Sequence, residues 1–261
     1  MKKEIIKARN ASYARYEELN LRKDEANKAA FQYENAYVRE FGELIMESFR
    51  MKMETVKKRK TIEFCSIFAN RGESVDQEAL RQYLEEEMAG YSRRLDDMIR
   101  DHEDAKKAKR ISEAELLKIK RIYHRLVKKI HPDMSPLTRE NEELKELWQR
   151  LTAAYRCNDL KTMEETEVLI NAVLKQLDMG ECEILIPDIE ERIRELEAEI
   201  ERIKTTDPYQ YRYLLDDDEA VSEKKQELER EISEYEDYGK QLDRMLEELL
   251  QKGVTITWRM N

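Results

Sequence analysis

Apolar residues recur every three or four positions over most of the chain, which predicts a succession of amphipathic helices. One stripe comprises Tyr37, Phe41, Leu44, Ile45, Phe49, Met53 and Val56, and a second comprises Leu80, Leu84, Met88, Tyr91, Leu95 and Met98. Gly72 separates the two stripes, and Ser74 with Gln77 resembles a capping box that opens the second helix. We therefore expect a long antiparallel helical hairpin over residues 1–110.

The middle of the chain predicts a smaller helical unit over residues 111–180. Ser112 and Glu115 form a capping-box pattern ahead of a helix that ends at Ile130, because Pro132 disfavours helical angles at the residue before it. Residues 131–138 contain two prolines and are expected to be a loop. Two further helices are expected over 140–158 and 161–177.

The last part of the chain, residues 181–261, has the most regular pattern. Its apolar positions alternate in steps of three and four: Ile189, Ile193, Leu196, Ile200 and Ile203, then Leu228, Ile232, Tyr235, Gly239, Leu242, Leu246 and Leu249. This spacing predicts an acidic antiparallel coiled-coil hairpin, although two chains could share the seam and form a homo-oligomer. The tail from Val254 to Trp258 alternates like a strand, with Ile184–Ile186 as its candidate partner.

Composition supports an all-α fold of long helices and coiled coils. Charged residues make up 41% of the 261 residues, with only six Gly and four Pro. Residues 181–250 carry 24 acidic against 10 basic residues, whereas residues 1–180 carry 34 against 36. An acidic C-terminal part repels phosphate backbones, so we expect no nucleic-acid partner. The basic run Lys57–Lys60 leaves nucleic-acid binding as an alternative, which would show a steep salt dependence.

The sequence also bears on location. No apolar run approaches the roughly 18 residues that span a membrane, and the N-terminus lacks the apolar stretch of a secretory signal. Cys65, Cys157 and Cys182 are odd in number and far apart, which favours reduced thiols. We therefore expect a cytoplasmic protein without a membrane partner.

No motif predicts an enzyme. The cysteines form no closely spaced metal-ligand pair, and His102 and His124 have no partner at ligand spacing. The chain has no glycine-rich phosphate loop and no Gly-x-Ser-x-Gly motif. We expect no catalytic residue, no metal and no cofactor.

The segment over residues 113–130 has two distinct faces. At about 100° per residue, its apolar side comprises Leu116, Ile119, Ile122, Tyr123, Leu126, Val127 and Ile130. Its basic side, called the basic stripe below, comprises Lys118, Arg121, Arg125, Lys128 and Lys129. The helix leads directly into His131-Pro132-Asp133, called the HPD loop below.

The sequence IYHRLVKKIHPD resembles helix II and the HPD loop of J domains, the modules that dock on DnaK-type heat-shock chaperones. Tyr123, Arg125, Leu126 and Lys129 occupy the family's tyrosine, basic, leucine and basic positions, and Trp148, Leu151, Ala154 and Tyr155 match helix III. The resemblance covers Ser112 to Asp159, less than a fifth of the chain. The family's first helix is not recognisable upstream, and its zinc-binding repeats and Gly/Phe-rich linker are absent.

The resemblance implies a co-chaperone rather than an enzyme. The basic stripe would meet an acidic surface of the chaperone's ATPase domain, Asp133 would pair with a chaperone arginine, and His131 and Pro132 would fix the loop and pack on the partner. Contact would stimulate ATP hydrolysis, while the flanking coiled coils hold an unidentified client protein. The alternative is a structural coiled-coil adaptor with a non-functional J-like segment.

Overall fold

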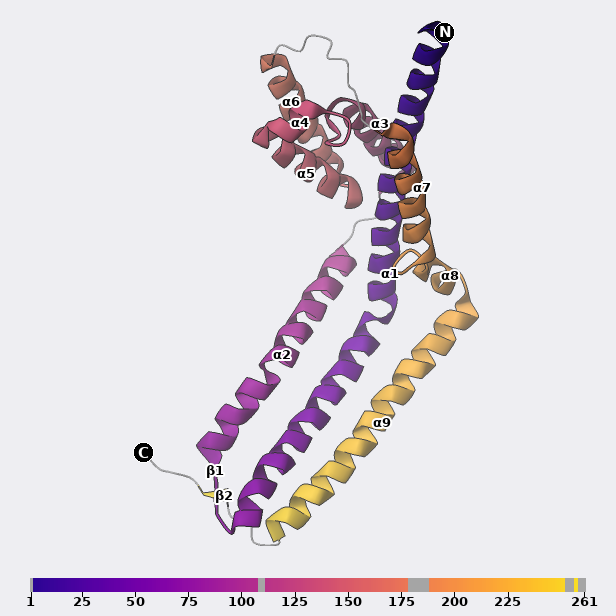
Figure 1. The fold of residues 1–261 in the computed structure, drawn as a ribbon. Coiled ribbons are helices and arrows are strands. Elements are labelled where there is room, and N and C mark those ends of the chain that lie inside the picture. The colour runs from indigo at the N-terminus through magenta and orange to yellow at the C-terminus, as the bar shows by residue number, and fades with distance from the viewer. Residues whose placement is uncertain (1, 108–110, 178–187, 252–255, 258–261) are drawn as a thin grey trace. The chain divides into compact units, whose positions relative to one another are not determined.

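The computed structural model describes residues 2–107, 111–177, 188–251 and 256–257 (Figure 1). This part of the protein is all-α, as predicted, apart from two strands of two residues each. The helices are α1 (Lys2–Arg71), α2 (Gln77–Lys107), α3 (Glu113–Ile130), α4 (Pro136–Glu140), α5 (Glu142–Arg156), α6 (Leu160–Gln176), α7 (Ile189–Thr205), α8 (Tyr211–Leu215) and α9 (Asp218–Gln251), and the strands are β1 (Val75–Asp76) and β2 (Ile256–Thr257). None of the described helices is long and apolar enough to cross a membrane.

Side-chain caps explain where three of the central helices begin. The Ser112 hydroxyl accepts a hydrogen bond from the Glu115 N–H, and the Glu115 carboxylate accepts one from the Ser112 N–H, which confirms the predicted capping box. Asn141 caps α5 and Asp159 caps α6 in the same way, each accepting a hydrogen bond from a backbone N–H three residues later.

Two local predictions are wrong. The start of α2 is capped by Asp76, whose Oδ1 accepts a hydrogen bond from the Glu78 N–H at 2.9 Å, and not by Ser74. Residues 131–138 are only partly loop, because α4 begins at Pro136. A proline is well tolerated in the first turn of a helix, where its missing N–H has no helical partner in any case.

The chain forms two compact units, and each combines segments that are distant in sequence. The first unit comprises Met1–Glu34 and Ala108–Arg212, and the second comprises Asn35–Lys107 and Tyr213–Asn261. This division differs from the three consecutive units expected over 1–110, 111–180 and 181–261. The difference arises because α1 contributes its N-terminal part to the first unit and the rest to the second.

The first unit has one continuous core. Its fully buried side chains include Leu19, Ile119, Tyr123, Leu126, Val127, Ile130, Leu144, Leu151, Met163 and Ile170, which come from α1, α3, α5 and α6. Helix α7 adds Ile193, Leu196 and Ile200 to the same cluster. Ion pairs between α1 and α7 flank this contact: Arg15 with Glu197 and Lys23 with Glu199, each at 2.8 Å.

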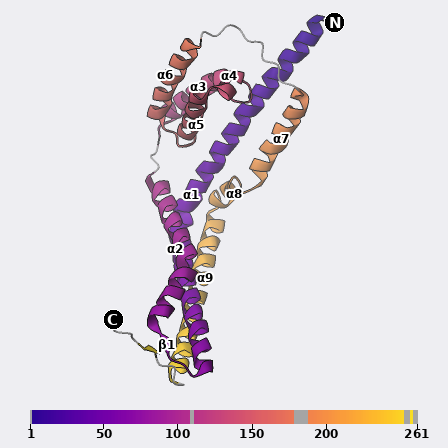
Figure 2. The same ribbon diagram turned by 60° about the vertical axis from the view of Figure 1, so that its left-hand side comes forward.

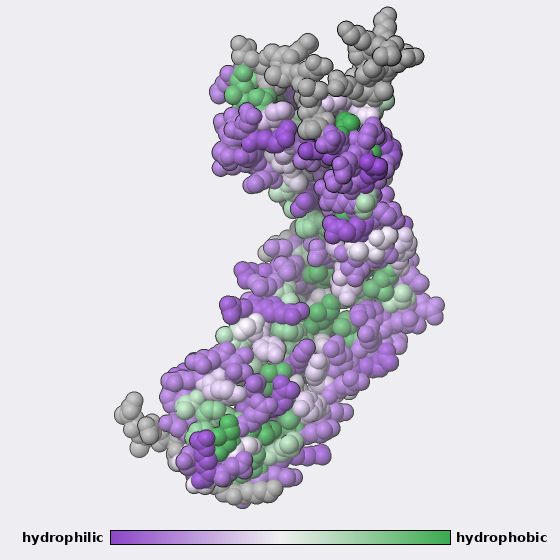
Figure 3. All heavy atoms as spheres, in the orientation of Figure 1, coloured by the Kyte–Doolittle hydropathy of each residue, from purple (hydrophilic) through white to green (hydrophobic). Residues whose placement is uncertain are grey.

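In the second unit, α1 runs between α2 and α9 in the view of Figure 1, and the three helices overlap in the turned view of Figure 2. The predicted antiparallel α1–α2 hairpin is present, with Lys60 paired to Glu87 and Lys106 to Glu43. Helix α9 runs parallel to α1, as the pairs Lys225–Glu40 and Lys58–Asp243 show. The visible face is largely hydrophilic, and hydrophobic residues appear in narrow strips between hydrophilic ones (Figure 3).

The antiparallel pairing of the two C-terminal seams with each other and the partner of the C-terminal strand were predicted wrongly. The α7 seam packs on the N-terminal part of α1, whereas the α9 seam packs on α1 within the second unit, so the two seams do not form one hairpin. Strand β2 pairs in parallel with β1, with Ile256 opposite Val75. The proposed partner Ile184–Ile186, together with Val254, Thr255, Trp258 and Cys182, lies outside the described residues.

Candidate protein-docking site

The HPD loop lies at the end of an antiparallel hairpin formed by α3 and α5. Near the loop, the His131 ring meets the edge of Trp148 with ring centroids 4.9 Å apart. Further from it, Tyr123 stacks on Tyr155 at 3.7 Å. Residue numbers therefore rise along α3 as they fall along α5, and the aromatic positions that carry the J-domain resemblance lie together in the core of the first unit.

His131 fixes the loop from inside. Its side chain is buried, and its Nδ1 accepts a hydrogen bond from the Asp133 N–H at 3.1 Å. Its backbone carbonyl accepts hydrogen bonds from the N–H groups of Met134 and Ser135, at 2.9 and 2.7 Å. Burial lowers the pKa of His131 to about 4, against the opposing effect of the Asp133 carboxylate. The imidazole is therefore neutral near pH 7, as an accepting Nδ1 requires.

Asp133 is the most exposed of the three residues of this anchored loop. Pro132 is half-buried and Asp133 is exposed. The Asp133 side chain makes no hydrogen bond or ion pair with the residues that the structure describes. It borders a cavity of about 260 Å³ that is also lined by Lys23 of α1 and Arg192 of α7. The loop thus presents an unpaired carboxylate on a rigid backbone.

Helix α1 packs against the α3–α5 hairpin beneath the HPD loop. The sequence analysis did not predict this contact. The Tyr123 hydroxyl donates a hydrogen bond to Asp24 at 2.9 Å, and Lys28 Nζ lies 3.8 Å from the centre of the Tyr155 ring. Burial raises the pKa of Asp24 to about 6 and lowers that of Lys28 to about 8. The spacing of Tyr13, Tyr16 and Leu19 indicates an apolar face here, but no local pattern identifies α3 as its partner.

The five residues of the basic stripe have different surroundings. Arg125 pairs with Glu167 and Lys118 with Glu164, both on α6, and Lys129 donates a hydrogen bond to Asn171 of α6 at 3.3 Å. Lys128 pairs with Glu17 of α1 at 2.6 Å. Arg121 is exposed and makes no ion pair within the described part of the chain. Helices α6 and α1 thus flank α3, and Arg121 is the exposed cation of the basic stripe whose side chain has neither an ion pair nor a hydrogen bond among the described residues.

The basic run Lys57–Lys60 is also largely engaged in ion pairs. Lys58 pairs with Asp243, Arg59 with Glu63, and Lys60 with Glu63 and Glu87. Three of its four cations are therefore directed at carboxylates of the second unit. This arrangement is that of a solvated, ion-paired helix face rather than of a patch open to phosphate groups.

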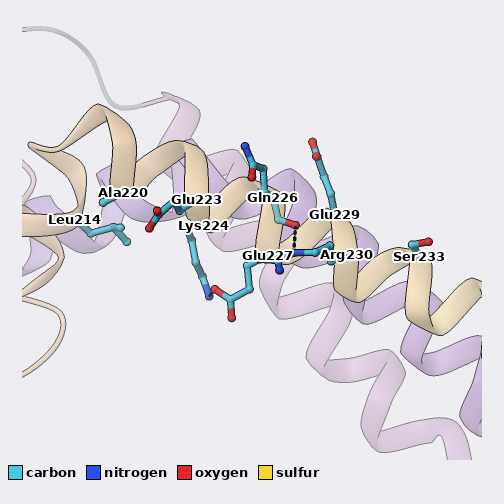
Figure 4. Close-up of a pocket in the computed structure, with 9 residues that line it drawn as sticks. All are labelled: Leu214, Ala220, Glu223, Lys224, Gln226, Glu227, Glu229, Arg230 and Ser233. Atoms are coloured by element: carbon cyan, nitrogen blue, oxygen red, sulfur yellow. Dashed lines mark hydrogen bonds and ion pairs between the residues drawn. The ribbon is translucent and has the colours of Figure 1, made fainter.

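The remaining candidate residues are scattered. Among the described cysteines, Cys65 is buried and Cys157 is exposed, and the described residues contain no group of three His, Cys, Asp or Glu side chains that could hold a metal ion. A depression in the second unit is lined by Leu214 and eight residues of α9 (Figure 4). Its walls come almost entirely from one helix, and they bear ion pairs such as Lys224 with Glu227.

No protein-family model, curated protein sequence or solved structure matches this chain. The resemblance to J domains therefore stays a prediction that rests on the residues of the HPD loop and its two flanking helices.

Proposed function

We propose that this protein is a J-domain-type co-chaperone that docks on a DnaK-type heat-shock chaperone and stimulates its ATP hydrolysis. The observation that carries the proposal is the HPD loop itself. Buried His131 fixes the loop backbone, and exposed Asp133 presents an unpaired carboxylate at the end of the α3–α5 hairpin. A carboxylate on a fixed backbone loses less conformational entropy when it binds a partner arginine, and the charge-assisted hydrogen bonds of such a pair are stronger than neutral ones.

The docking mechanism would use two contacts. The Asp133 carboxylate accepts charge-assisted hydrogen bonds from a chaperone arginine. Arg121, together with those cations of the basic stripe that can exchange partners, meets an acidic surface and sets the orientation and rate of encounter. Stimulation follows if the chaperone conformation that hydrolyses ATP binds this surface more tightly than the resting one does.

We assign the binding of a client protein or an anchoring partner to the long helices of the second unit. The described residues 35–107 and 213–251 of this unit are mostly helical, carry ion pairs between their helices, and do not include the HPD loop. A client protein or an anchoring partner would bind there, so that the first unit brings the chaperone to it.

A structural coiled-coil adaptor is the second candidate, and one observation favours it. Three of the five cations of the basic stripe are paired with carboxylates of this same chain. A stripe whose charges are satisfied internally can serve the fold alone, without a chaperone partner.

Single-turnover ATP hydrolysis by DnaK-type chaperones, with and without the full chain, tests the proposal. Asp133→Asn removes the exposed charge without touching the core, and it should reduce stimulation about tenfold or more, since hydrogen bonds to charged groups contribute about 1.5–3 kcal/mol. His131→Gln should abolish stimulation, because it removes the imidazole whose Nδ1 accepts the hydrogen bond from the Asp133 N–H and fixes the loop backbone. Glu140→Gln, at an exposed position in nearby α4, is the matched control and should stimulate like the wild type.

Two results would contradict the co-chaperone proposal. One is a folded chain that leaves ATP turnover unchanged with several DnaK-type chaperones. The other is an Asp133→Asn variant that stimulates as well as the wild type. Self-association in sedimentation experiments, combined with unchanged ATP turnover, would support the adaptor.

A further inference from the structure

Helix α6 lies along the basic stripe and is held there by the core. Met163 and Ile170 of α6 are fully buried in the same cluster as Ile119 and Leu126 of α3. The cross-helix contacts Lys118–Glu164, Arg125–Glu167 and Lys129–Asn171 follow one another along both helices, so α6 runs parallel to α3. The polar edge of α6 therefore follows the stripe for about two turns.

Two carboxylates of α6 hold cations that the docking site would use. Arg125 approaches Glu167 Oε1 with two nitrogens, Nε at 2.8 Å and Nη2 at 2.5 Å, and the Glu167 side chain is only 19% exposed. Glu164 forms an ion pair with Lys118, and both of these side chains are about half exposed. Arg125 is thus held more firmly than Lys118, because its partner is the less hydrated carboxylate.

We infer that Glu164 and Glu167 compete with an acidic partner surface for Lys118 and Arg125, so that α6 sets the affinity of the docking site from within the same unit. This inference rests on the co-chaperone function proposed above. The apolar contacts of α6 keep the helix in place, so the competition is between carboxylates and needs no opening of the fold. Because ion pairs at the surface are individually weak, the effect is graded rather than blocking.

The test is the chain concentration that gives half-maximal stimulation of single-turnover ATP hydrolysis by the chaperone. Glu164→Gln/Glu167→Gln should lower this concentration about three- to tenfold, as expected for the release of two partly exposed ion pairs. Glu165→Gln is the matched control, since Glu165 lies on the same helix and pairs with Arg150 of α5 at 2.9 Å instead of with the stripe. It should change the concentration less than twofold.

Ionic strength gives a second readout. The difference in half-maximal concentration between the double variant and the wild type should shrink as the salt concentration is raised. Added ions screen both the internal ion pairs and the contact with the partner. Thermal unfolding of each variant checks that the fold is kept. If the double variant unfolds, Glu164→Gln alone carries the test, because the Glu164 side chain is half exposed, and its expected gain is about twofold.

The outcomes separate this inference from the proposed function. Wild-type stimulation with an unchanged half-maximal concentration in the double variant would overturn the inference and leave the proposed function standing. An equal gain from Glu165→Gln would also overturn it, because net charge rather than the stripe would then be the cause. No stimulation by the wild type would overturn both.

Discussion

The two compact units bury their apolar side chains in different ways, although α1 contributes to both. In the first unit, 20 buried residues join into one cluster drawn from α1, α3, α5, α6, α7 and the loop after α3. In the described part of the second unit, the corresponding cluster contains only Cys65, Val75 and Leu80 as buried members, and other buried side chains such as Phe41 and Leu242 lie along helix seams. The comparison shows that several short helices packed on one end of α1 share a single core, whereas the long charged helices bury their apolar side chains along narrow helix–helix seams.

The largest expected effect comes from truncating one buried leucine in each unit. Leu151→Ala should lower the free energy of unfolding by about 3–4 kcal/mol, because Leu151 is fully buried in the cluster to which five helices contribute. Leu242→Ala, at 3% exposure in α9, should cost about 2 kcal/mol, because a single seam can close over the lost volume. Urea unfolding followed by circular dichroism measures both, and equal losses would remove the distinction between core and seam.

A pH series sharpens the comparison, since the buried His131 and the half-buried Asp24 of the first unit have opposite effects on how the free energy of unfolding depends on pH. The pKa of His131 falls from 6.5 to about 4, so the stability that depends on its neutral form is complete above pH 6.5 and is lost as the pH falls toward 4. The pKa of Asp24 rises from 3.8 to about 6, so its charged form costs stability above pH 6, and this cost disappears as the pH falls toward 4. In the wild type the two effects partly cancel.

Variants should reveal the two effects separately. Asp24→Asn keeps an acceptor for the Tyr123 hydroxyl and removes a half-buried charge, so it should stabilise the protein by about 1–2 kcal/mol at pH 7.5. The same variant should then lose stability more steeply than the wild type between pH 6.5 and 4. His131→Gln should show the opposite slope. Hydrogen exchange of α3 at a series of pH values measures this, and parallel pH profiles for all three proteins would refute the assignment.

The smallest of these effects concerns close helix approach in the second unit. A Cβ atom at Gly42 would lie 2.9 Å from His102 Cδ2, so Gly42→Ala must displace a buried imidazole and should cost about 1–2 kcal/mol. Gly90 is also helical but has open space around it, and Gly90→Ala should stabilise by about 0.5–1 kcal/mol. Thermal unfolding distinguishes the two, and a stabilising Gly42→Ala would show that the α1–α2 seam adapts easily.

Local features of the fold could be predicted from the sequence because they depend on neighbouring residues. The capping box at Ser112 and the helix end before Pro132 each involve groups within a few positions of one another. The left-handed conformation of Gly72, with φ of +68°, follows for the same reason. The antiparallel α1–α2 hairpin was predictable because a short turn leaves two striped helices few other arrangements.

Pairings between distant segments could not be predicted in this way. The apolar stripe of α7 specifies a buried face but not its partner, and in the structure that partner is the Tyr16 and Leu19 face of α1. In the candidate site, the position of the HPD loop directly after α3 could be predicted, because Pro132 disfavours helical angles at the residue before it. The pairing of Arg125 with Glu167 could not, because it depends on the packing of α6 against α3.

The hydrogen bond between Asp24 and Tyr123 joins residues 99 positions apart. At a translation rate of about 5–20 residues per second, the α1 side of this contact leaves the ribosome roughly 5–20 seconds before its α3 partner does. During that interval Tyr16 and Leu19, which are buried in the finished first unit, have no α3 core to cover them. Synthesis of this protein therefore includes a stage in which the apolar face of its earliest helix is uncovered, and this stage ends only when α3 and then α7 have also emerged.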